Sequence, residues 1–187
     1  MSLPRRSAVL FEDETDLLLF PPLQGAWARR GESSSVGLSG WNARRVLFGA
    51  IHVLSGHRLT LVQKRQRAGE FQDFLDVLRW HYRGWHPVLL LDEDSAHTAE
   101  ETLGVAEDLD IELLSLPKRV PKFNGMDQLW RRAKATVSAN KQYESIDEHA
   151  DRFVRHVLRL SPHDALRKAG ILSEDFWLKP YLHGPHG

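Results

Sequence analysis

The sequence predicts an α/β domain built on a mixed sheet, and three observations support this fold class. Apolar runs of strand length dominate the first third of the chain. A helical apolar stripe and a strand–helix–strand pattern follow, and further helical patterns close the chain. Hairpin strands followed by a βαβ unit give a sheet that contains antiparallel and parallel pairs, with helices packed on it.

The early strands lie between residues 7 and 63. The runs SAVLFED and DLLLFPPL predict two strands joined by a tight turn, and the second ends at a proline pair. Residues 25 to 45 mix Gly, Ser and Arg, which predicts a loop-rich stretch with one short strand around Trp27. The runs VLFGAIHV and HRLTLVQ flank Leu54-Ser55-Gly56 and predict a β-hairpin, in which the glycine supplies a positive φ.

A helix and a βαβ unit come next. Apolar residues recur at helical spacing at Phe71, Phe74, Leu75, Leu78 and Tyr82. The unbroken run VLLL predicts a central strand covered on both faces, and this strand ends at Asp92. Thr98 and Glu101 form a capping-box pattern that opens a helix over TAEETLGVAEDL, and IELLSLP supplies the second strand of the unit.

The rest of the chain predicts helices and an irregular tail. One helix begins at Asn124, and Ser145 with Glu148 caps the next one. A last short helix runs from Ser161-Pro162 to Gly170, with proline in its first turn and glycine just past its end. The tail ILSEDFWLKPYLHGPHG has no clear period and predicts an irregular extension.

Bulk composition bounds the class of protein. A chain of 187 residues with 42% hydrophobic and 27% charged residues predicts one folded globular domain. The absence of an apolar run of membrane-spanning length, and of a signal peptide, predicts a cytoplasmic protein. Because the chain has no cysteine, disulfides, thiolate metal sites and cysteine nucleophiles are excluded, and any metal is held by oxygen or imidazole ligands.

The net charge is zero, but the charges are segregated along the chain. Residues 92 to 112 include nine acids and no Lys or Arg, whereas residues 118 to 141 include seven bases and a single acid, Asp127. Two interpretations stay open on this pattern. The segments form solvated helix faces of opposite sign, or they pair an acidic metal-binding pocket with a basic rim that binds phosphate.

Three carboxylates stand at the ends of elements that the predicted sheet would bring together. Asp13 follows the first strand, Asp92 follows the central strand, and Asp127 lies in the first turn of a helix. Each also has a structural interpretation: an edge-strand charge, a turn residue, and a first-turn acid. For Asp127 this interpretation is strong, because Asn124 is a natural N-cap and Arg131 lies four residues further on.

Taken in order, the three motifs VLFEDE, LLLDEDSAH and LPKRVPKFNGMDQLWRRAK resemble the catalytic domain of mariner-like and related bacterial insertion-sequence transposases. In that family the first Asp lies in an Asp-Glu pair, the second opens D-N-x-x-x-H, and the third acid follows L-P-x-x-x-P-x-x-N-x-x. The matching positions here are Asp13-Glu14, Asp92 with His97, and Leu116, Pro117, Pro121, Asn124 and Asp127, followed by Trp130 and Lys134. The 34 residues between Asp92 and Asp127 are the interval that this group favours.

The resemblance implies an RNase H-like fold, with a mixed five-stranded sheet flanked by helices, and an acidic-triad active site. Asp13, Asp92 and Asp127 would be the catalytic residues and the metal ligands, with Asp13 bridging two Mg²⁺ ions, for which Mn²⁺ can substitute. The reaction would be metal-dependent DNA phosphodiester cleavage and strand transfer at transposon ends. Other interpretations are an inactive remnant that acts as a DNA-binding or dimerisation module, and an RNase H-type hydrolase acting on RNA.

Further residues receive roles by the same resemblance. Glu14, His97 and Asn124 would support the site, although His97 at a helix start also suits a purely local hydrogen bond. Trp130 falls on an apolar helical stripe, so core packing is its expected role. Contacts with DNA phosphates are expected from basic residues that would equally suit a solvated face: Lys118, Arg119, Lys122, Arg131, Arg132 and Lys134.

The resemblance also bears on organisation and partners. Residues 1–187 would form a single catalytic domain, with a core of about residues 8–160 and a helical extension over 161–187. The family's N-terminal helix-turn-helix domain would be absent, because the chain begins almost at the first catalytic strand. The expected partners are the terminal inverted repeats of a transposon, target DNA and a second copy of the chain, and no membrane. The protein would associate with the bacterial nucleoid when acting.

Overall fold

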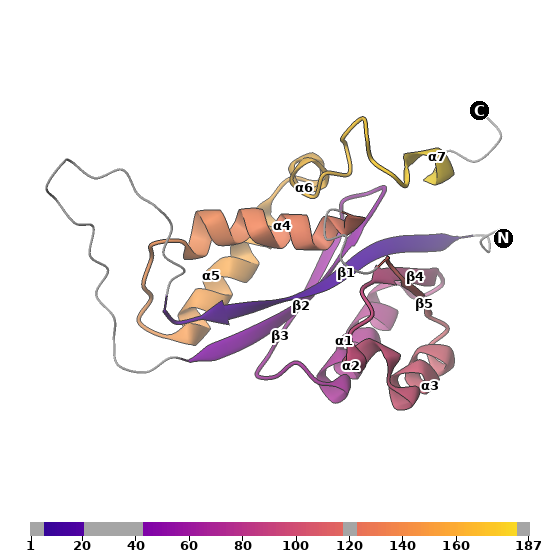
Figure 1. Ribbon diagram of the computed structural model, residues 1–187, viewed down its shortest axis with the longest axis horizontal. Coiled ribbons are helices and arrows are strands. Elements are labelled where there is room, and N and C mark those ends of the chain that lie inside the picture. Colours follow the sequence, from indigo (N-terminus) through magenta and orange to yellow (C-terminus); the bar gives the residue numbers. More distant parts are fainter. Residues whose placement is uncertain (1–5, 21–42, 118–122, 183–187) are drawn as a thin grey trace, which may run out of the picture.

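A mixed five-stranded sheet with helices on both faces forms the centre of the computed structural model (Figure 1). The structure describes residues 6–20, 43–117 and 123–182. The strands are β1 (Ser7–Leu18), β2 (Arg44–His52), β3 (Arg58–Gln63), β4 (His86–Leu91) and β5 (Glu112–Ser115), in the spatial order β3-β2-β1-β4-β5. The β1–β2 and β2–β3 pairs are antiparallel, whereas β1–β4 and β4–β5 are parallel, which confirms the predicted mixed sheet.

Strand β1 corrects one prediction. Residues 7–18 form a single strand of 12 residues, where the sequence pattern predicted two strands joined by a turn. Three consecutive acids, Glu12 to Glu14, suggested the turn, yet all three pair with β2 in regular register. Their side chains alternate between the two faces of the sheet, so the three carboxylates are not all on the same face.

The other strand predictions are confirmed within the described residues. The β2–β3 hairpin forms where expected, and Gly56 in its connection has a φ of +67°. Strand β4 lies inside the sheet and is nearly all buried, and β4, α3 and β5 form the predicted βαβ unit. The strand expected around Trp27 lies outside the described residues.

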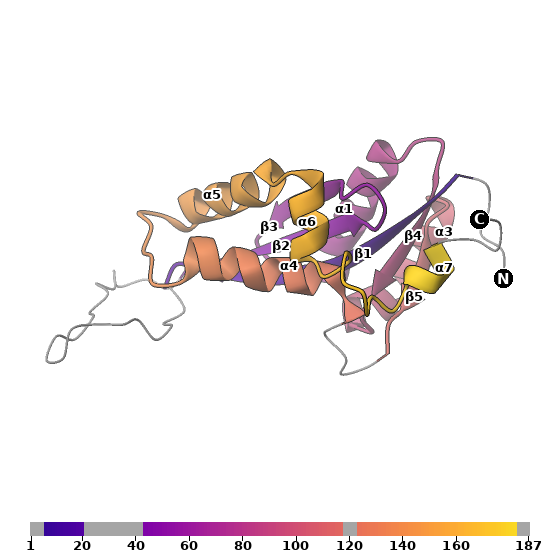
Figure 2. The same ribbon diagram turned by 90° about the horizontal axis from the view of Figure 1, so that it is seen from above.

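Helices cover the sheet on both faces, around two separate apolar clusters. On one face lie α1 (Ala68–His81), α2 (Ser95–Thr98) and α3 (Glu100–Asp108), which appear below the sheet in Figure 1. On the other lie α4 (Gly125–Ala133), a π-helical turn η2 (Lys134–Ser138), α5 (Ile146–Arg159) and α6 (Pro162–Lys168), which lie side by side in Figure 2. Within the described ranges, none of these helices combines the length and apolarity that crossing a bilayer demands.

Helix caps agree with the sequence at three starts and differ at one. Asn124, Ser145 and Ser161 accept hydrogen bonds from backbone amides of α4, α5 and α6. The predicted capping box at Thr98 is wrong, because Thr98 ends the short helix α2 and its hydroxyl donates to the Asp94 carbonyl oxygen at 3.1 Å. Asp94 is the N-cap of α2, and it lies three residues after Leu91, the last residue of β4.

The tail packs on the sheet as an irregular extension, as predicted. Over its described part, to residue 182, only α7 (Lys179–Leu182) is regular. The ring of Phe11 in β1 meets the rings of Phe176 and Trp177 edge-on, at centroid distances of 6.0 and 6.2 Å. Since the Trp177 indole also donates to the Phe123 carbonyl oxygen, the tail braces the segment that leads into α4.

Helix α4 approaches the sheet closely over Gly49 of β2. A Cβ atom built on this glycine would lie 2.3 Å from Cζ2 of Trp130 and 2.7 Å from Cε of Met126. Both side chains belong to α4 and are buried, so neither has room to move aside. Gly49 also pairs directly with Asp13 of β1, which places this close approach at the centre of the sheet.

Replacing Gly49 with alanine should therefore destabilise the fold. The overpacked methyl group is expected to cost about 1–3 kcal/mol of unfolding free energy. Chemical denaturation followed by circular dichroism measures it. Gly104→Ala is the matched control, because a Cβ there meets nothing within 4 Å and the residue lies inside α3. This control should gain about 0.5–1 kcal/mol, and equal effects at both positions would contradict the packing argument.

Candidate active site

Asp13 lies in the middle of β1, on the face of the sheet that α4 covers. Strand residues alternate between faces, and the odd-numbered neighbours Phe11 and Leu17 belong to the apolar cluster beneath α4. The parallel register of β1 with β4 pairs Phe11 with Leu90. Continuing that register by two residues puts Asp92, just past the end of β4, level with Asp13.

Electrostatics show that the three predicted acids share one region. Burial raises the pKa of Asp13 well above its ordinary value, and the charges of Glu14, Asp127 and Asp92 raise it further. Such a sum of repulsions requires the carboxylates of the first, central and last motifs to lie near one another. The structure therefore places Asp13, Asp92 and Asp127, from β1, the end of β4 and the first turn of α4, within electrostatic range of one another, although among the described residues their carboxylate oxygens do not form a group within 4.8 Å.

Asp127 lies in the first turn of α4, and one of its carboxylate oxygens has no hydrogen-bond partner among the described residues. The Asn124 side chain caps this helix by accepting from the Met126 amide at 2.9 Å, as the sequence predicted. Arg131 Nη2 lies 2.9 Å from Asp127 Oδ2, which confirms the predicted i, i+4 ion pair. That oxygen is buried and makes no hydrogen bond among the described residues, so the guanidinium is close without being aligned to donate.

Two side chains of the α4 region hold the backbone of β1 beside Asp13. Asn124 Nδ2 donates to the Glu12 carbonyl oxygen at 2.7 Å, and Trp130 Nε1 donates to the Asp13 carbonyl oxygen at 3.2 Å. Trp130 is buried, which confirms its predicted core packing, and its indole N–H adds a polar anchor. Asn124 thus serves both as helix cap and as tie to the strand.

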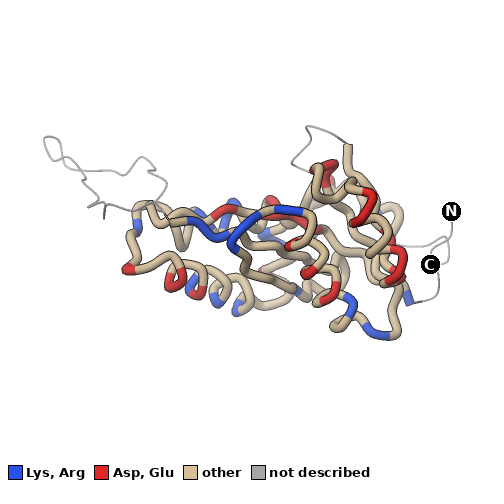
Figure 3. Tube along the Cα trace, turned by 90° about the horizontal axis from the view of Figure 1, so that it is seen from below, with Lys and Arg blue, Asp and Glu red and all other residues tan. Residues whose placement is uncertain are grey.

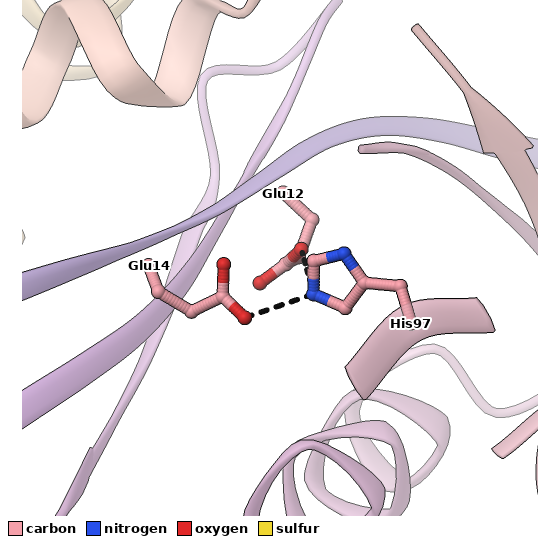
Figure 4. A group of neighbouring side chains, drawn as sticks. All are labelled: Glu12, Glu14 and His97. Carbon is pink, nitrogen blue, oxygen red and sulfur yellow. Dashed lines mark hydrogen bonds and ion pairs between the residues drawn. The ribbon is translucent and has the colours of Figure 1, made fainter. Parts of the chain in front are cut away.

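His97 joins the second motif to the first. Its Nδ1 lies 3.0 Å from the Asp92 carbonyl oxygen and 3.2 Å from Asp92 Oδ1, and its Nε2 lies 2.8 Å from Glu14 Oε1 (Figure 4). Burial lowers the pKa of His97, but hydrogen bonds to Asp92 and Glu14 outweigh it and raise that pKa to about 11. The hydrogen bond from His97 in turn lowers the pKa of Asp92.

The predicted basic residues separate into three groups. Burial lowers the pKa of Lys134, while the charges of Asp16, Asp13 and Asp127 raise it, so its ammonium group lies within electrostatic range of these acids. Arg131 pairs with Asp127, and Arg132 is exposed on α4. Lys118, Arg119 and Lys122 lie outside the described residues. In Figure 3, acidic positions (red) gather around the α3 end of the molecule, where the acid-rich segment of residues 92 to 112 folds.

Glu12 is the residue of this region that the sequence reasoning missed. Its side chain is fully buried on the face opposite Asp13, and neither carboxylate oxygen has a hydrogen-bond partner within the described part of the chain. Burial, together with the charge of Glu14, raises its pKa well above the ordinary value. An available signal was the alternation of β1, because Glu12 shares its face with the core residues Ala8 and Leu10.

The fold and the convergence of acids define a class, the RNase H-like catalytic domains of nucleic-acid-processing enzymes. A family model described as DDE superfamily endonuclease matches residues 8–149, well over half of the chain. The chain belongs to this family.

Relatives and solved structures agree with this assignment. The chain is 27% identical over 140 residues to the insertion element IS630 uncharacterized 39 kDa protein of Shigella sonnei. That match covers 74% of this chain and 41% of the relative, so the chain spans less than half of the relative's length.

Structures of Mos1 transposase share the fold. The mariner Mos1 paired-end complex with Mg has a TM-score of 0.72 at 16% identity, covering 91% of this chain and 54% of that chain. The Mos1 catalytic domain alone has a TM-score of 0.64 at 14% identity, covering 92% and 80%. The RNase H-like fold predicted by resemblance is thus confirmed.

The double role of Asn124 gives a stability prediction. Asn124→Ala removes both the cap of α4 and the hydrogen bond to the Glu12 carbonyl oxygen, at an expected cost of roughly 2–4 kcal/mol. Ser145→Ala is the matched control, because the Ser145 hydroxyl caps α5 by accepting from the Glu148 amide at 3.1 Å. Its loss should cost only about 1 kcal/mol. Equal costs in urea denaturation would show that the tie to β1 contributes nothing.

Proposed function

We propose that this chain is the catalytic domain of a transposase, which cleaves DNA at transposon ends and joins the freed 3′ end to target DNA. One observation carries the proposal: carboxylates from three separate elements lie close enough for Asp127 and Asp92 to raise the pKa of Asp13. Packing like charges together is unfavourable unless a cation compensates them. Membership of the DDE superfamily endonuclease family supports the same chemistry.

Divalent metal ions fit these residues. Mg²⁺ prefers carboxylate oxygens and water, and the buried oxygen of Asp127 that lacks a hydrogen bond is an available ligand. In our proposal Asp13, Asp92 and Asp127 would hold these ions, with two ions as the expected number. Such ions, when bound, activate the attacking oxygen and stabilise the leaving oxygen of a phosphodiester. The Mos1 structures, which include complexes with Mg and with Mn, support Mn²⁺ as a substitute.

The other residues of the site hold these acids in position. The side chains of Asn124 and Trp130 fix the backbone of β1 on either side of the Asp13 Cα atom. His97 binds Asp92 through Nδ1 and Glu14 through Nε2, which restrains the second acid relative to the first strand. His97, Glu14 and Asn124 are thus proposed as positioning residues.

DNA is the proposed partner, with contacts to its phosphates from basic side chains near the acids. Lys134 is the first candidate in the described chain, because Asp13 and Asp127 act electrostatically on its ammonium group and raise its pKa. Arg131 and Arg132 extend the basic surface along α4, and Lys118, Arg119 and Lys122 precede it in sequence. One similar structure is a Mos1 transposase paired-end complex with the left transposon end, which supports transposon ends as substrates. A second copy of the chain is a further proposed partner.

Removing one carboxylate should abolish cleavage without unfolding the protein. Asp127→Asn keeps the size and first-turn position of the side chain but lowers nicking of supercoiled plasmid DNA in Mn²⁺ by about 100-fold or more. Asp13→Asn and Asp92→Asn should do the same, and agarose gels measure the rate. Asp108→Asn, at an exposed site on α3, is the control and should cleave normally.

Wild-type protein that never cleaves DNA at any Mg²⁺ or Mn²⁺ concentration would favour the inactive DNA-binding or dimerisation module. Faster cleavage of an RNA–DNA hybrid than of duplex DNA would instead favour an RNase H-type hydrolase.

Lys134 gives a separate test of the DNA contact. Lys134→Gln should weaken binding to a duplex oligonucleotide and reduce the slope of log affinity against log salt by about 0.9, the effect of one phosphate contact. Fluorescence anisotropy at several salt concentrations measures this slope. Lys64→Gln, at an exposed position just past β3, removes the same charge away from the acids and should leave the slope unchanged. An unchanged slope for Lys134→Gln would remove Lys134 from the DNA-binding surface.

A further inference from the structure

A second group of possible metal ligands lies on the opposite face of β1 from Asp13. Glu12, Glu14 and His97 each offer one ligand atom, and these three atoms all lie within 4.8 Å of one another. Figure 4 shows both carboxylates pointing toward the imidazole from the strand, while His97 comes from α2. The ring of Phe71 in α1 packs against His97 with centroids 4.4 Å apart, so the group is closed by apolar contacts.

Glu12 is the unusual member of this group. Its side chain has no exposed surface, and neither Oε1 nor Oε2 has a hydrogen-bond partner in the described chain. A buried polar group without a partner costs free energy, and a carboxylate costs more than a neutral group. His97 Nε2 lies 3.7 Å from Oε2, beyond hydrogen-bond distance. The Glu12 carboxylate therefore points toward His97 without receiving a hydrogen bond from it or from Glu14.

The orientation of His97 makes its Nε2 the ligand atom. Nδ1 lies 3.0 Å from the Asp92 carbonyl oxygen, and a carbonyl oxygen only accepts hydrogen bonds, so Nδ1 carries a hydrogen. Nε2 then faces the two glutamates. A proton on Nε2 would satisfy Glu14 at 2.8 Å, but it would leave both oxygens of Glu12 without a bond. A cation that takes several ligands at once would satisfy all three residues.

We propose that Glu12, Glu14 and His97 form a structural site for a borderline transition-metal ion such as Zn²⁺. His97 Nε2, Glu14 Oε1 and both oxygens of Glu12 supply four donor atoms, the number found in closed structural zinc sites. Two carboxylates balance the charge of a divalent ion, so the buried group becomes neutral. The imidazole ligand selects Zn²⁺ or Co²⁺ over Mg²⁺, which prefers oxygen ligands.

This site is distinct from the candidate catalytic site but adjoins it. The Asp13 side chain lies on the α4 face of β1, whereas Glu12 and Glu14 lie on the α1 face. Asp92 contacts the far nitrogen of the ligating ring, as outer-shell carboxylates and carbonyls do for many metal-bound histidines. A metal ion held by His97 Nε2 would fix the ring, and the ring would fix Asp92. The ion would therefore have a structural role.

Metal binding to a variant without catalytic acids tests the proposal. In the full chain carrying Asp13→Asn and Asp127→Asn, we expect one Co²⁺ per chain with the visible absorption of a four-coordinate site. Zn²⁺ should displace it, and Mg²⁺ in large excess should not. Adding Glu12→Gln or His97→Gln should weaken Co²⁺ binding by more than about 100-fold, and Asp92→Asn, which removes an outer-shell partner, by about 10–100-fold.

A second measurement guards against variants that fail to fold. In the wild-type chain with saturating Mg²⁺, added Zn²⁺ should raise the Tm, because a ligand that binds only the folded state stabilises it. The proposal would be overturned if the chain did not bind one Co²⁺, or if Glu12→Gln and His97→Gln left Co²⁺ binding unchanged. Either result would show that the three residues are held together by protons and hydrogen bonds alone. The proposed DNA cleavage is tested separately with the catalytic acids present, so either conclusion can fail without the other.

Discussion

The packing of helix α4 on the backbone of β1 is the contact on which the candidate site depends. Asn124 and Trp130 donate to consecutive carbonyl oxygens, those of Glu12 and Asp13, and Gly49 leaves the space that the indole fills. These contacts fix the helix start within reach of the strand centre. Asp127 lies in the first turn of this helix, so the same contacts position its carboxylate. The charge of Asp127 accordingly contributes to the raised pKa of Asp13.

The same region concentrates charge where a stable fold would avoid it. Glu12, Asp13 and Glu14 are consecutive acids at the centre of the sheet, and the pKa values of Glu12 and Asp13 are both raised by burial and by neighbouring carboxylates. When no metal ion is bound, the charge of His97 lowers the pKa of Glu12 and offsets part of this repulsion. Functional sites commonly retain such unfavourable arrangements, because the chemistry needs the charge. The π-helical turn that begins at Lys134 is a further irregularity of the kind found near functional sites.

Much of the fold could be predicted from the sequence, because its elements obey simple periods. The β2–β3 hairpin has apolar runs around a glycine turn, and α1 and α5 carry regular apolar stripes. The element pattern also predicted that the sheet would bring Asp13, Asp92 and Asp127 together, but only the resemblance gave them a joint role, since each acid alone suited a structural role. Spacing along a chain does not reveal which side chains meet across a sheet. For that reason the contact of His97 with Glu14 and the close approach at Gly49 came only from the structure.

Local rules failed where tertiary contacts overrode them. Three acids in a row resemble a turn, yet pairing with β2 keeps β1 extended through them. Thr98 and Glu101 resemble a capping box, yet the chain turns earlier, at Asp94, and Thr98 closes the helix that follows. The burial of Glu12 is the clearest case, because no propensity predicts a fully enclosed carboxylate. Its environment depends on His97 of α2, which lies 83 residues further along the chain than Glu14.

The pairing of β1 has a consequence for how the chain distinguishes its own acids. FEDE presents three carboxylates in succession, and composition alone gives no reason to prefer the middle one. A slip of a single residue against β2 and β4 would turn Glu12 or Glu14 toward α4 and bury Asp13 against His97. Nine register positions with β2 and five with β4 oppose that slip. The register of β1 thus determines which of the three acids faces α4, because alternate residues of a strand point to opposite faces of the sheet.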